Sequence, residues 1–301
     1  MKTKNAAGLA VILLILGVTP GARAQGVIEF TEELDFDRPE SWAMKYFASL
    51  SLLTGMGVPE PMGGGALALG FEGGFVPQLS DEQRRVGFEG TKVEDVNKTR
   101  FFGRLRAAIG LSDNYTLDVG YTPPFEVGGA TPHLIAVGVG RPFNLSESWR
   151  LGVRAYGQYG TIDGDITCSA DEVAAGRDPE LNPFFCEEPS DDSLTQRLVG
   201  GELSVGYVAG RWRPYAGAAL NYMDLDFQVN ARYDGFVDST LQLTDGITFS
   251  VTTGVGFAPS EKWYLSAELF YSWLSVNRPP STSTQNDGFL NGRFLVAYRI
   301  R

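Results

Sequence analysis

Alternation of apolar and polar residues along extended runs is the feature that most limits how this chain can fold. From Trp149 to Tyr159 the odd positions are mainly apolar and the even positions hold Arg, Gly, Tyr or Gln, and a similar alternation runs from Trp263 to Trp273. Successive side chains of a β-strand point to opposite faces, whereas an amphipathic helix repeats about every 3.6 residues. The pattern therefore predicts strands with one apolar and one polar face.

The alternation extends over most of the chain and predicts twelve strands, an even number. The predicted strands cover residues 42–54, 65–76, 84–91, 99–111, 114–126, 132–143, 149–162, 194–209, 212–226, 246–258, 262–274 and 289–300. Their connections are of two kinds. Short turns lie at 112–114, 144–148, 210–211 and 259–262, and long polar loops lie near 163–193, 227–245 and 276–288. Short turns at one end and long loops at the other are typical of a transmembrane β-barrel.

Each short turn is followed by an aromatic residue on the apolar face of the next strand. These residues are Tyr115, Trp149, Trp212 and Trp263. Equal register would place all four rings at one height, where the interface between membrane and water favours amphipathic aromatic side chains. We therefore expect them to form an interfacial aromatic girdle.

With these features the chain resembles the bacterial outer-membrane β-barrel class, in a porin-like form of about twelve strands. The resemblance implies a closed antiparallel transmembrane β-barrel with short periplasmic turns and long extracellular loops, located in the outer membrane of a Gram-negative cell. It also implies outer-membrane lipids and the barrel-assembly machinery as partners. A soluble β-sandwich or a periplasmic up-and-down barrel is the alternative fold.

The first 24 residues have the features of a cleaved signal peptide. Lys2 and Lys4 precede an apolar stretch, and Ala22-Arg23-Ala24 matches a small-x-small cleavage site. The expected organisation is a signal peptide over 1–24, an acidic segment over 25–40 and a barrel domain over 41–301. The full chain has 36 acidic and 25 basic side chains, and this negative charge argues against nucleic acid as a partner.

The polar faces of the predicted strands suggest what the barrel lumen contains. The lumen candidates are Arg104, Arg106, Asp118, Arg150, Arg154, Glu202, Glu268 and Arg293. On the same parity lie Lys45 and Glu72, and the basic residues outnumber the acidic ones. An arginine-rich wall would favour small anionic solutes in a channel. In the alternative interpretation, the arginines pair with the inward carboxylates and fill a closed lumen.

The acidic N-terminal segment suits a basic lumen. Residues 26–39 contain Glu29, Glu32, Glu33, Asp35 and Asp37, so this stretch could act as a plug or a gate. The leading functional hypothesis is passive diffusion of small solutes, anions in particular. The alternative is a closed structural or adhesion barrel that acts through its loops. An outer-membrane hydrolase and lateral uptake of hydrophobic compounds are weaker hypotheses.

Motifs for catalysis and cofactor binding are weak. The single histidine, His133, is followed two positions later by Ile135 instead of the serine that outer-membrane lipases place there. A pair of catalytic carboxylates needs no sequence motif and stays open. Cys168 and Cys186 lie in the longest loop, where we expect an exported protein to join them in a disulfide; a pair of free reactive thiols is the alternative. We expect no enzyme activity, metal or cofactor, and the charged stretch 80–98 matches no recognisable mechanism.

Overall fold

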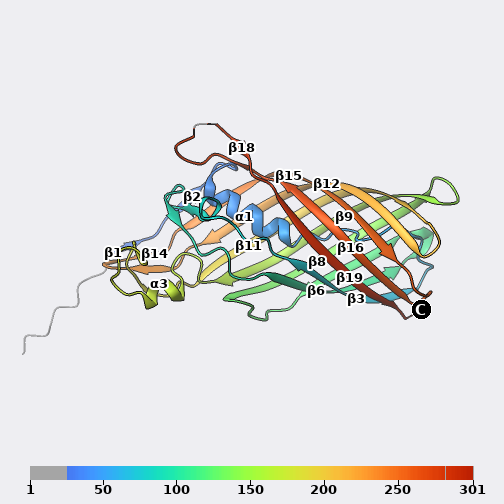
Figure 1. Ribbon diagram of the computed structural model, residues 1–301, viewed down its shortest axis with the longest axis horizontal. Coiled ribbons are helices and arrows are strands. Elements are labelled where there is room, and N and C mark those ends of the chain that lie inside the picture. The colour runs from blue at the N-terminus through green and yellow to red at the C-terminus, as the bar shows by residue number, and fades with distance from the viewer. Residues whose placement is uncertain (1–25, 282, 301) are drawn as a thin grey trace, which may run out of the picture.

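The computed structural model describes residues 26–281 and 283–300, so the predicted signal peptide lies outside the described residues. Ten antiparallel strands pair in a ring that closes on itself (Figure 1). In order around the barrel they are β3 (Leu67–Phe75), β6 (Phe101–Gly110), β7 (Thr116–Thr122), β8 (Ala130–Asn144), β9 (Trp149–Gly164), β11 (Asp192–Tyr207), β12 (Trp212–Gln228), β15 (Leu241–Phe257), β16 (Trp263–Trp273) and β19 (Phe289–Arg299). The pairing of β19 with β3 closes the ring, so every barrel strand has a partner on each side.

The prediction of twelve strands is wrong by two. Residues 42–54 lie largely in the helix α1 (Pro39–Leu50), and 84–91 fall in a small unit made of α2 (Asp81–Arg84), β4 (Arg85–Gly87) and β5 (Lys92–Val93). Helix α1 is buried nearly all round, so its sequence lacks the polar stripe that identifies a surface helix. The ten other predicted strands correspond to the ten strands of the barrel.

The connections between barrel strands are short at one end of the molecule and long at the other. The short-turn end contains 111–115, 145–148, 208–211 and 258–262, with the 3-10 turn η1 (Ser112–Asn114) in the first of these. The long-loop end contains 76–100, 123–129, 165–191, 229–240 and 274–288. Strands β9, β11, β12 and β15 have 16 or 17 residues, whereas β3 has 9 and β7 has 7. The barrel wall is therefore taller on one side.

Short elements cover the long-loop end. A four-stranded sheet joins β1 (Gly26–Ile28), β14 (Phe236–Asp238), β13 (Ala231–Tyr233) and β10 (Cys186–Glu188). β2 (Thr31–Glu33) pairs in parallel with the first residues of β15 and lies outside the ring. The remaining elements are α3 (Ala170–Ala174), β17 (Ser275–Val276) and β18 (Gln285–Asn286). We call the loops and short elements at this end the cap.

The chain crosses the barrel interior before it forms the wall. It begins in the cap with β1 and β2, continues as α1, and reaches β3 at the short-turn end (Figure 1). Trp42, Tyr46, Leu52 and Leu53 on this path have no exposed surface. We call residues 39–60 the plug. In the described part of the chain, no helix is both long and apolar enough to span a membrane.

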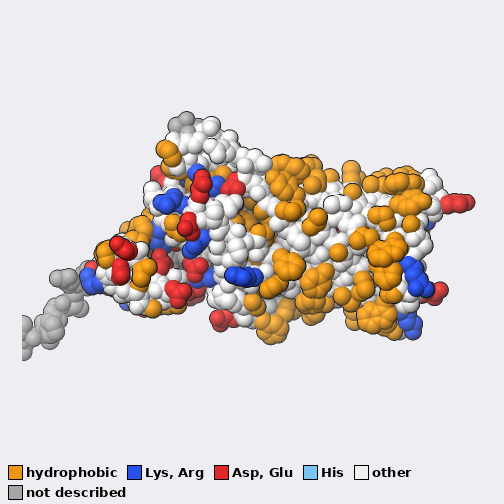
Figure 2. Space-filling view, in the orientation of Figure 1, with side chains coloured by type: hydrophobic (Ala, Val, Ile, Leu, Met, Phe, Trp, Pro, Cys, Tyr) orange, Lys and Arg blue, Asp and Glu red, His pale blue; other side chains and the backbone are white. Residues whose placement is uncertain are grey.

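The outer surface of the barrel is apolar over the wall and charged at the cap. Side chains such as Ile247, Val199 and Leu203 point outward and are 67%, 59% and 59% exposed. In Figure 2, hydrophobic side chains spread over the barrel wall, whereas acidic and basic side chains gather mainly at the long-loop end. A large exposed apolar belt requires a non-aqueous surrounding or a partner.

Candidate functional site

The barrel lumen contains a network of charged side chains that holds the plug. Arg293 on β19 donates from Nη1 to the carbonyl oxygen of Leu52 at 2.8 Å, and from Nη2 to those of Ser49 and Leu50 at 3.1 and 3.2 Å. The last carbonyls of a helix have no partner within the helix and carry partial negative charge. Arg293 satisfies these groups and matches their charge.

A second arginine completes the same end of the helix. Arg104 on β6 donates from Nη1 to Ser51 O at 2.8 Å and from Nη2 to Leu52 O at 3.3 Å. Its Nε and Nη2 also bond the two carboxylate oxygens of Glu72 at 3.1 and 2.7 Å. Arg106 reaches Glu72 Oε2 at 3.2 Å. Because Glu72 has no exposed surface, these two arginines balance a buried charge.

A third arginine binds the chain just beyond the helix. Arg154 on β9 donates to the carbonyl oxygen of Leu53 and forms ion pairs with Asp118 at 3.1 Å and Glu202 at 3.2 Å. The Glu202 carboxylate in turn accepts from the backbone N–H of Gly55, at 3.1 Å for Oε2. Carbonyl groups of the plug thus accept hydrogen bonds from guanidinium groups, and the N–H of Gly55 donates to a carboxylate.

The carboxylate of Glu268 binds the side chain of Thr54 in the plug. Thr54 Oγ1 donates to Glu268 Oε1 at 2.7 Å, and the hydroxyl of Tyr215 donates to Oε2 at 3.2 Å. Four arginines and four carboxylates surround the plug between Ser49 and Gly55, namely Arg104, Arg106, Arg154, Arg293, Glu72, Asp118, Glu202 and Glu268. The charges of these four arginines are therefore compensated, and Arg104, Arg154 and Arg293 also donate to backbone carbonyls.

The other predicted lumen residues lie elsewhere. Arg150 lies beside the turn 145–148, where Nη1 donates to Ser146 O at 2.8 Å, so it is a rim residue. Lys45 belongs to α1 instead of a strand, and its ammonium bonds the carbonyl oxygens of Phe36 and Ser275. Lys45 is buried, but it lies on a helix, so its inward position follows from the path of α1 and not from the parity of a strand. Pro39 at the first helical turn, with Glu40 after it, was a usable helix-start signal.

The acidic N-terminal segment begins in the cap and does not fill the lumen as a whole. β1 pairs with β14 and β2 with β15, both at the long-loop end. Glu32 pairs with Arg38 at 2.8 Å, and Arg38 also contacts Glu40 at 3.1 Å. The lumen is occupied by the mainly apolar residues that follow, so charge attraction between an acidic segment and a basic wall does not describe this contact.

A cavity of about 410 Å³, lined by both polar and apolar side chains, lies on the short-turn side of the plug. Its lining includes Met56, Val58 and Glu60 of the plug and Arg106, Asp118 and Ser204 of the wall. An ion pair between Glu60 and Arg213 holds the end of the plug against β12. The cavity, here called the vestibule, borders the network, because Arg106, Asp118, Arg154 and Glu202 also line it.

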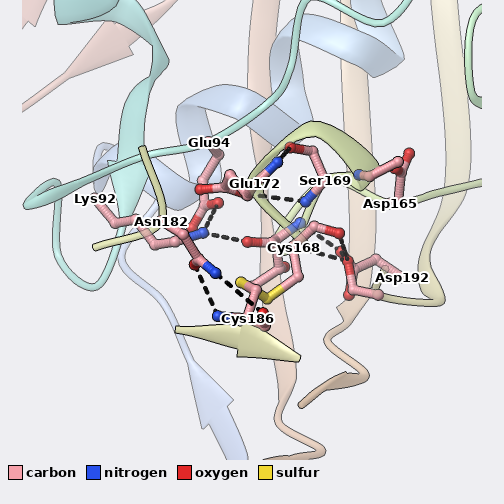
Figure 3. Close-up of a disulfide and its surroundings, with 12 residues drawn as sticks. Lys92, Glu94, Asp165, Cys168, Ser169, Glu172, Asn182, Cys186 and Asp192 are labelled. Atoms are coloured by element: carbon pink, nitrogen blue, oxygen red, sulfur yellow. Dashed lines mark hydrogen bonds and ion pairs between the residues drawn. A yellow bond between two sulfur atoms is a disulfide. The ribbon is translucent and has the colours of Figure 1, made fainter. Parts of the chain in front are cut away.

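The cap is tied together by a disulfide and by buried ion pairs (Figure 3). Cys168 and Cys186 are bonded to each other, and Cys168 has no exposed surface. Next to them, Lys92 Nζ contacts Glu94 Oε2 at 2.5 Å and the carbonyl oxygen of Thr167. Asn182 Oδ1 accepts from Cys186 N at 2.8 Å. The loop 165–191 is therefore packed against the loop 76–100.

The aromatic residues predicted for the girdle all face outward at the short-turn end. Trp149, Trp212 and Trp263 begin β9, β12 and β16 and are 47%, 56% and 47% exposed, and Tyr115 just precedes β7. Each tryptophan packs on an aromatic ring of the neighbouring strand: Tyr207, Phe257 and Tyr298, respectively. His133 is also exposed and lies 3.4 Å from the hydroxyl of Tyr121. Among the described residues, no cluster of three or more His, Cys, Asp or Glu side chains is arranged to hold a metal.

The comparisons with known proteins identify similar barrels and no family. No family model matches the chain, and no curated protein matches it. The structure is similar to Ail, the attachment invasion locus protein of Yersinia pestis, with 12% identity, a TM-score of 0.31 and coverage of 79% of this chain and 100% of Ail. It is also similar to the translocator domain of the autotransporter NalP from Neisseria meningitidis, with 12% identity, a TM-score of 0.40 and coverage of 79% and 90%.

A third similar structure is the outer membrane protease OmpT from Escherichia coli, with 8% identity, a TM-score of 0.33 and coverage of 78% of this chain and 92% of OmpT. These similar structures are bacterial outer-membrane β-barrels. The named proteins include an attachment protein, a translocator domain and a protease, so the comparison leaves the function of this chain open.

Proposed function

We propose that this protein is an outer-membrane β-barrel whose lumen is sealed by its own plug and whose function is carried by the cap. The observation that supports the seal best is the set of guanidinium bonds to the carbonyls of residues 49–53. Arginine donors that are engaged with backbone are not available to a permeating anion. The proposed role is binding or adhesion at the cap, without catalysis.

The spacing of outward aromatic rings supports a membrane-spanning wall. On three strands two exposed rings lie ten positions apart: Trp149 and Tyr159, Trp212 and Tyr222, and Trp263 and Trp273. Ten residues at about 3.3 Å each, tilted by roughly 40°, span about 25 Å along the barrel axis, which is the height of the apolar band of an outer-membrane barrel. The rings would then lie at the two interfaces.

Charged residues begin just beyond the second ring. Tyr222 is paired in register with Val199, and the next outward pair toward the cap is Arg197 with Asp224. Arg197 forms ion pairs with Asp224 at 3.4 Å and Asp226 at 2.6 Å. This change from apolar to charged residues fits a membrane boundary, with the cap outside the cell and the short turns in the periplasm.

Single-channel conductance in a planar bilayer tests the seal. The refolded wild-type protein is expected to give no steady openings. The double variant Arg293→Met with Glu268→Gln removes three bonds to plug carbonyls, keeps an acceptor for Thr54 and leaves no unpaired charge at this register pair. We expect this variant to open transiently because the end of α1 is released.

The matched control is Arg197→Met with Asp226→Asn, which breaks an ion pair on the outer surface of the wall and leaves the lumen unchanged. It should stay silent. Steady openings of the wild-type protein would contradict the seal and would favour the alternative function, diffusion of small solutes. The vestibule of about 410 Å³, which contains charged side chains of the network, is the observation that favours that alternative.

A further inference from the structure

The cap and the plug enclose a mainly apolar pocket that the network around the plug does not use. It has a volume of about 90 Å³, several times the ~10–15 Å³ that a single water needs. Met44 and Phe47 of α1 form one side, and Val86, Val96 and Leu194 lie on other sides. Four of these five side chains are buried, and Phe47 is partly buried. Apolar walls around an open space favour an apolar occupant.

One residue of the pocket lining, Tyr233, carries a buried hydroxyl that lacks a hydrogen-bond partner in the part of the chain that the structure describes. Tyr233 is 1% exposed, its ring packs on Phe236 with centroids 4.8 Å apart, and its hydroxyl has no hydrogen-bond partner among residues 26–281 and 283–300. An unpaired buried hydroxyl is unfavourable, because the group loses its hydrogen bonds to water without gaining a partner. Burial and the nearby carboxylate of Glu94 raise the pKa of Tyr233, so the hydroxyl stays protonated and can donate.

The charge of the lining limits the occupant further. The pocket is lined by four acidic residues, Glu40, Glu94, Asp163 and Asp238, and by no Lys or Arg within the described residues. Glu40, Asp163 and Asp238 each accept a hydrogen bond from a neighbouring group. The cations nearest to this lining, Arg38 and Lys92, are already paired with Glu40 and Glu94. An anionic ligand would therefore lose its hydration among apolar walls without gaining a cation of its own. The aromatic rings of Phe47, Phe88 and Phe227 also line the pocket and favour a flat ring.

We propose that this pocket binds a small neutral aromatic molecule that carries one hydroxyl or carbonyl oxygen, with Tyr233 as the hydrogen-bond donor. The inference rests on the proposed function, because α1 of the plug forms one wall of the pocket and must stay in place. It names the class of ligand that the cap would recognise. Phenol, benzene and benzoate are a matched set of probes that share a ring and differ in the oxygen group and the charge.

Met44 provides a local reporter. We would label methionine methyl groups with ¹³C in the full protein in lipid nanodiscs and titrate each probe by NMR. Phenol should shift the Met44 methyl signal saturably, whereas Met62, which lines the vestibule at the other end, should not move. Phenol should bind at least tenfold more tightly than benzoate. Empty nanodiscs correct for partition of the probe into lipid.

Two variants separate the hydroxyl from the cavity. Tyr233→Phe keeps the ring packing and should weaken phenol about tenfold, while benzene binding stays unchanged. Ala43→Leu, on the pocket face of α1, fills the space with a good helix former and should abolish the saturable Met44 shift for both probes. The buried Met223 signal checks that each variant is folded.

Absence of a saturable Met44 shift in the folded wild-type protein would overturn the proposal, as would equal phenol binding by Tyr233→Phe and wild type. Conductance of the same purified protein in a planar bilayer separates failure of the ligand site from failure of the proposed function. If the bilayer is silent and the Met44 signal does not shift, the ligand site is contradicted and the sealed barrel is not. A conducting bilayer contradicts the sealed barrel, whatever the probes do.

Discussion

A guanidinium group has five N–H donors, and three arginines of the lumen use some of theirs to hold the backbone of the plug. Arg293 donates from two nitrogens to three carbonyls of the plug, and Arg104 donates both to Glu72 and to two carbonyls. The inward position of these arginines could be predicted because strand parity is a local property. Their partners could not, because Ser49 and Arg293 are far apart in the sequence and their contact depends on the path of the plug.

The carboxyl of Glu94 in the cap predicts a pH dependence. Burial raises the pKa of Glu94 to about 8 from its ordinary 4.5, although the ammonium of Lys92 opposes this shift. The folded cap therefore binds this proton more tightly than the unfolded chain does. The resulting stability is fully present below pH 4.5 and is lost as the pH rises through about 8.

Amide hydrogen exchange of the loop 76–100, measured between pH 5 and 9 and corrected for the intrinsic exchange rate, checks this prediction. Protection should fall across the range in the wild-type protein, and Glu94→Gln should flatten the dependence. Glu180→Gln, at an exposed position in the cap, should leave it unchanged. If protection in the wild-type protein instead rises with pH, the ammonium of Lys92 outweighs burial, and the pKa of Glu94 is lowered instead of raised.

The elements that sequence reasoning located best are the barrel strands, and the one it misassigned most seriously is α1. In residues 42–54, Trp42, Met44 and Tyr46 happen to alternate with Ala43 and Lys45, which imitates a strand. A helix that is enclosed by a barrel needs no polar stripe, so periodicity cannot separate the two states. Helix-forming Ala, Met, Lys and Leu after Pro39 favour the observed helix.

The loop 165–191 is an element whose order depends on its disulfide. The link joins residues 18 positions apart, and replacing both cysteines by serine should destabilise the loop by about 3 kcal/mol through the freedom regained by the unfolded loop. Arg177 in this loop is 77% exposed and is a trypsin site. Cleavage after Arg177 should then be up to about 100-fold faster in the serine variant.

Cleavage after Arg211, in a short turn at the opposite end, is the internal control and should not change. Equal rates after Arg177 in the two proteins would show that packing against the loop 76–100 orders the segment without the covalent link.

The path of the whole chain makes a prediction about orientation. β1 lies in the cap, whereas β19 ends at the short-turn end, so the two described ends of the chain lie at opposite ends of the barrel (Figure 1). With the cap outside the cell, an epitope tag inserted between Gln25 and Gly26 should bind antibody on intact cells. A tag added after Arg301 should bind only after the outer membrane is made permeable. The reverse pattern would invert the orientation.

The sequence by itself determined where the barrel strands lie, which face of each is apolar and where the aromatic rings stand, because a strand's period of two is set by local backbone geometry. The tertiary structure alone decided that ten strands close the ring and that residues 39–60 fill the lumen. An inward arginine looks the same in a sequence whether it faces water or a carbonyl. Which of these it meets depends on contacts between distant segments, such as Arg293 with Leu52 and Glu202 with Gly55.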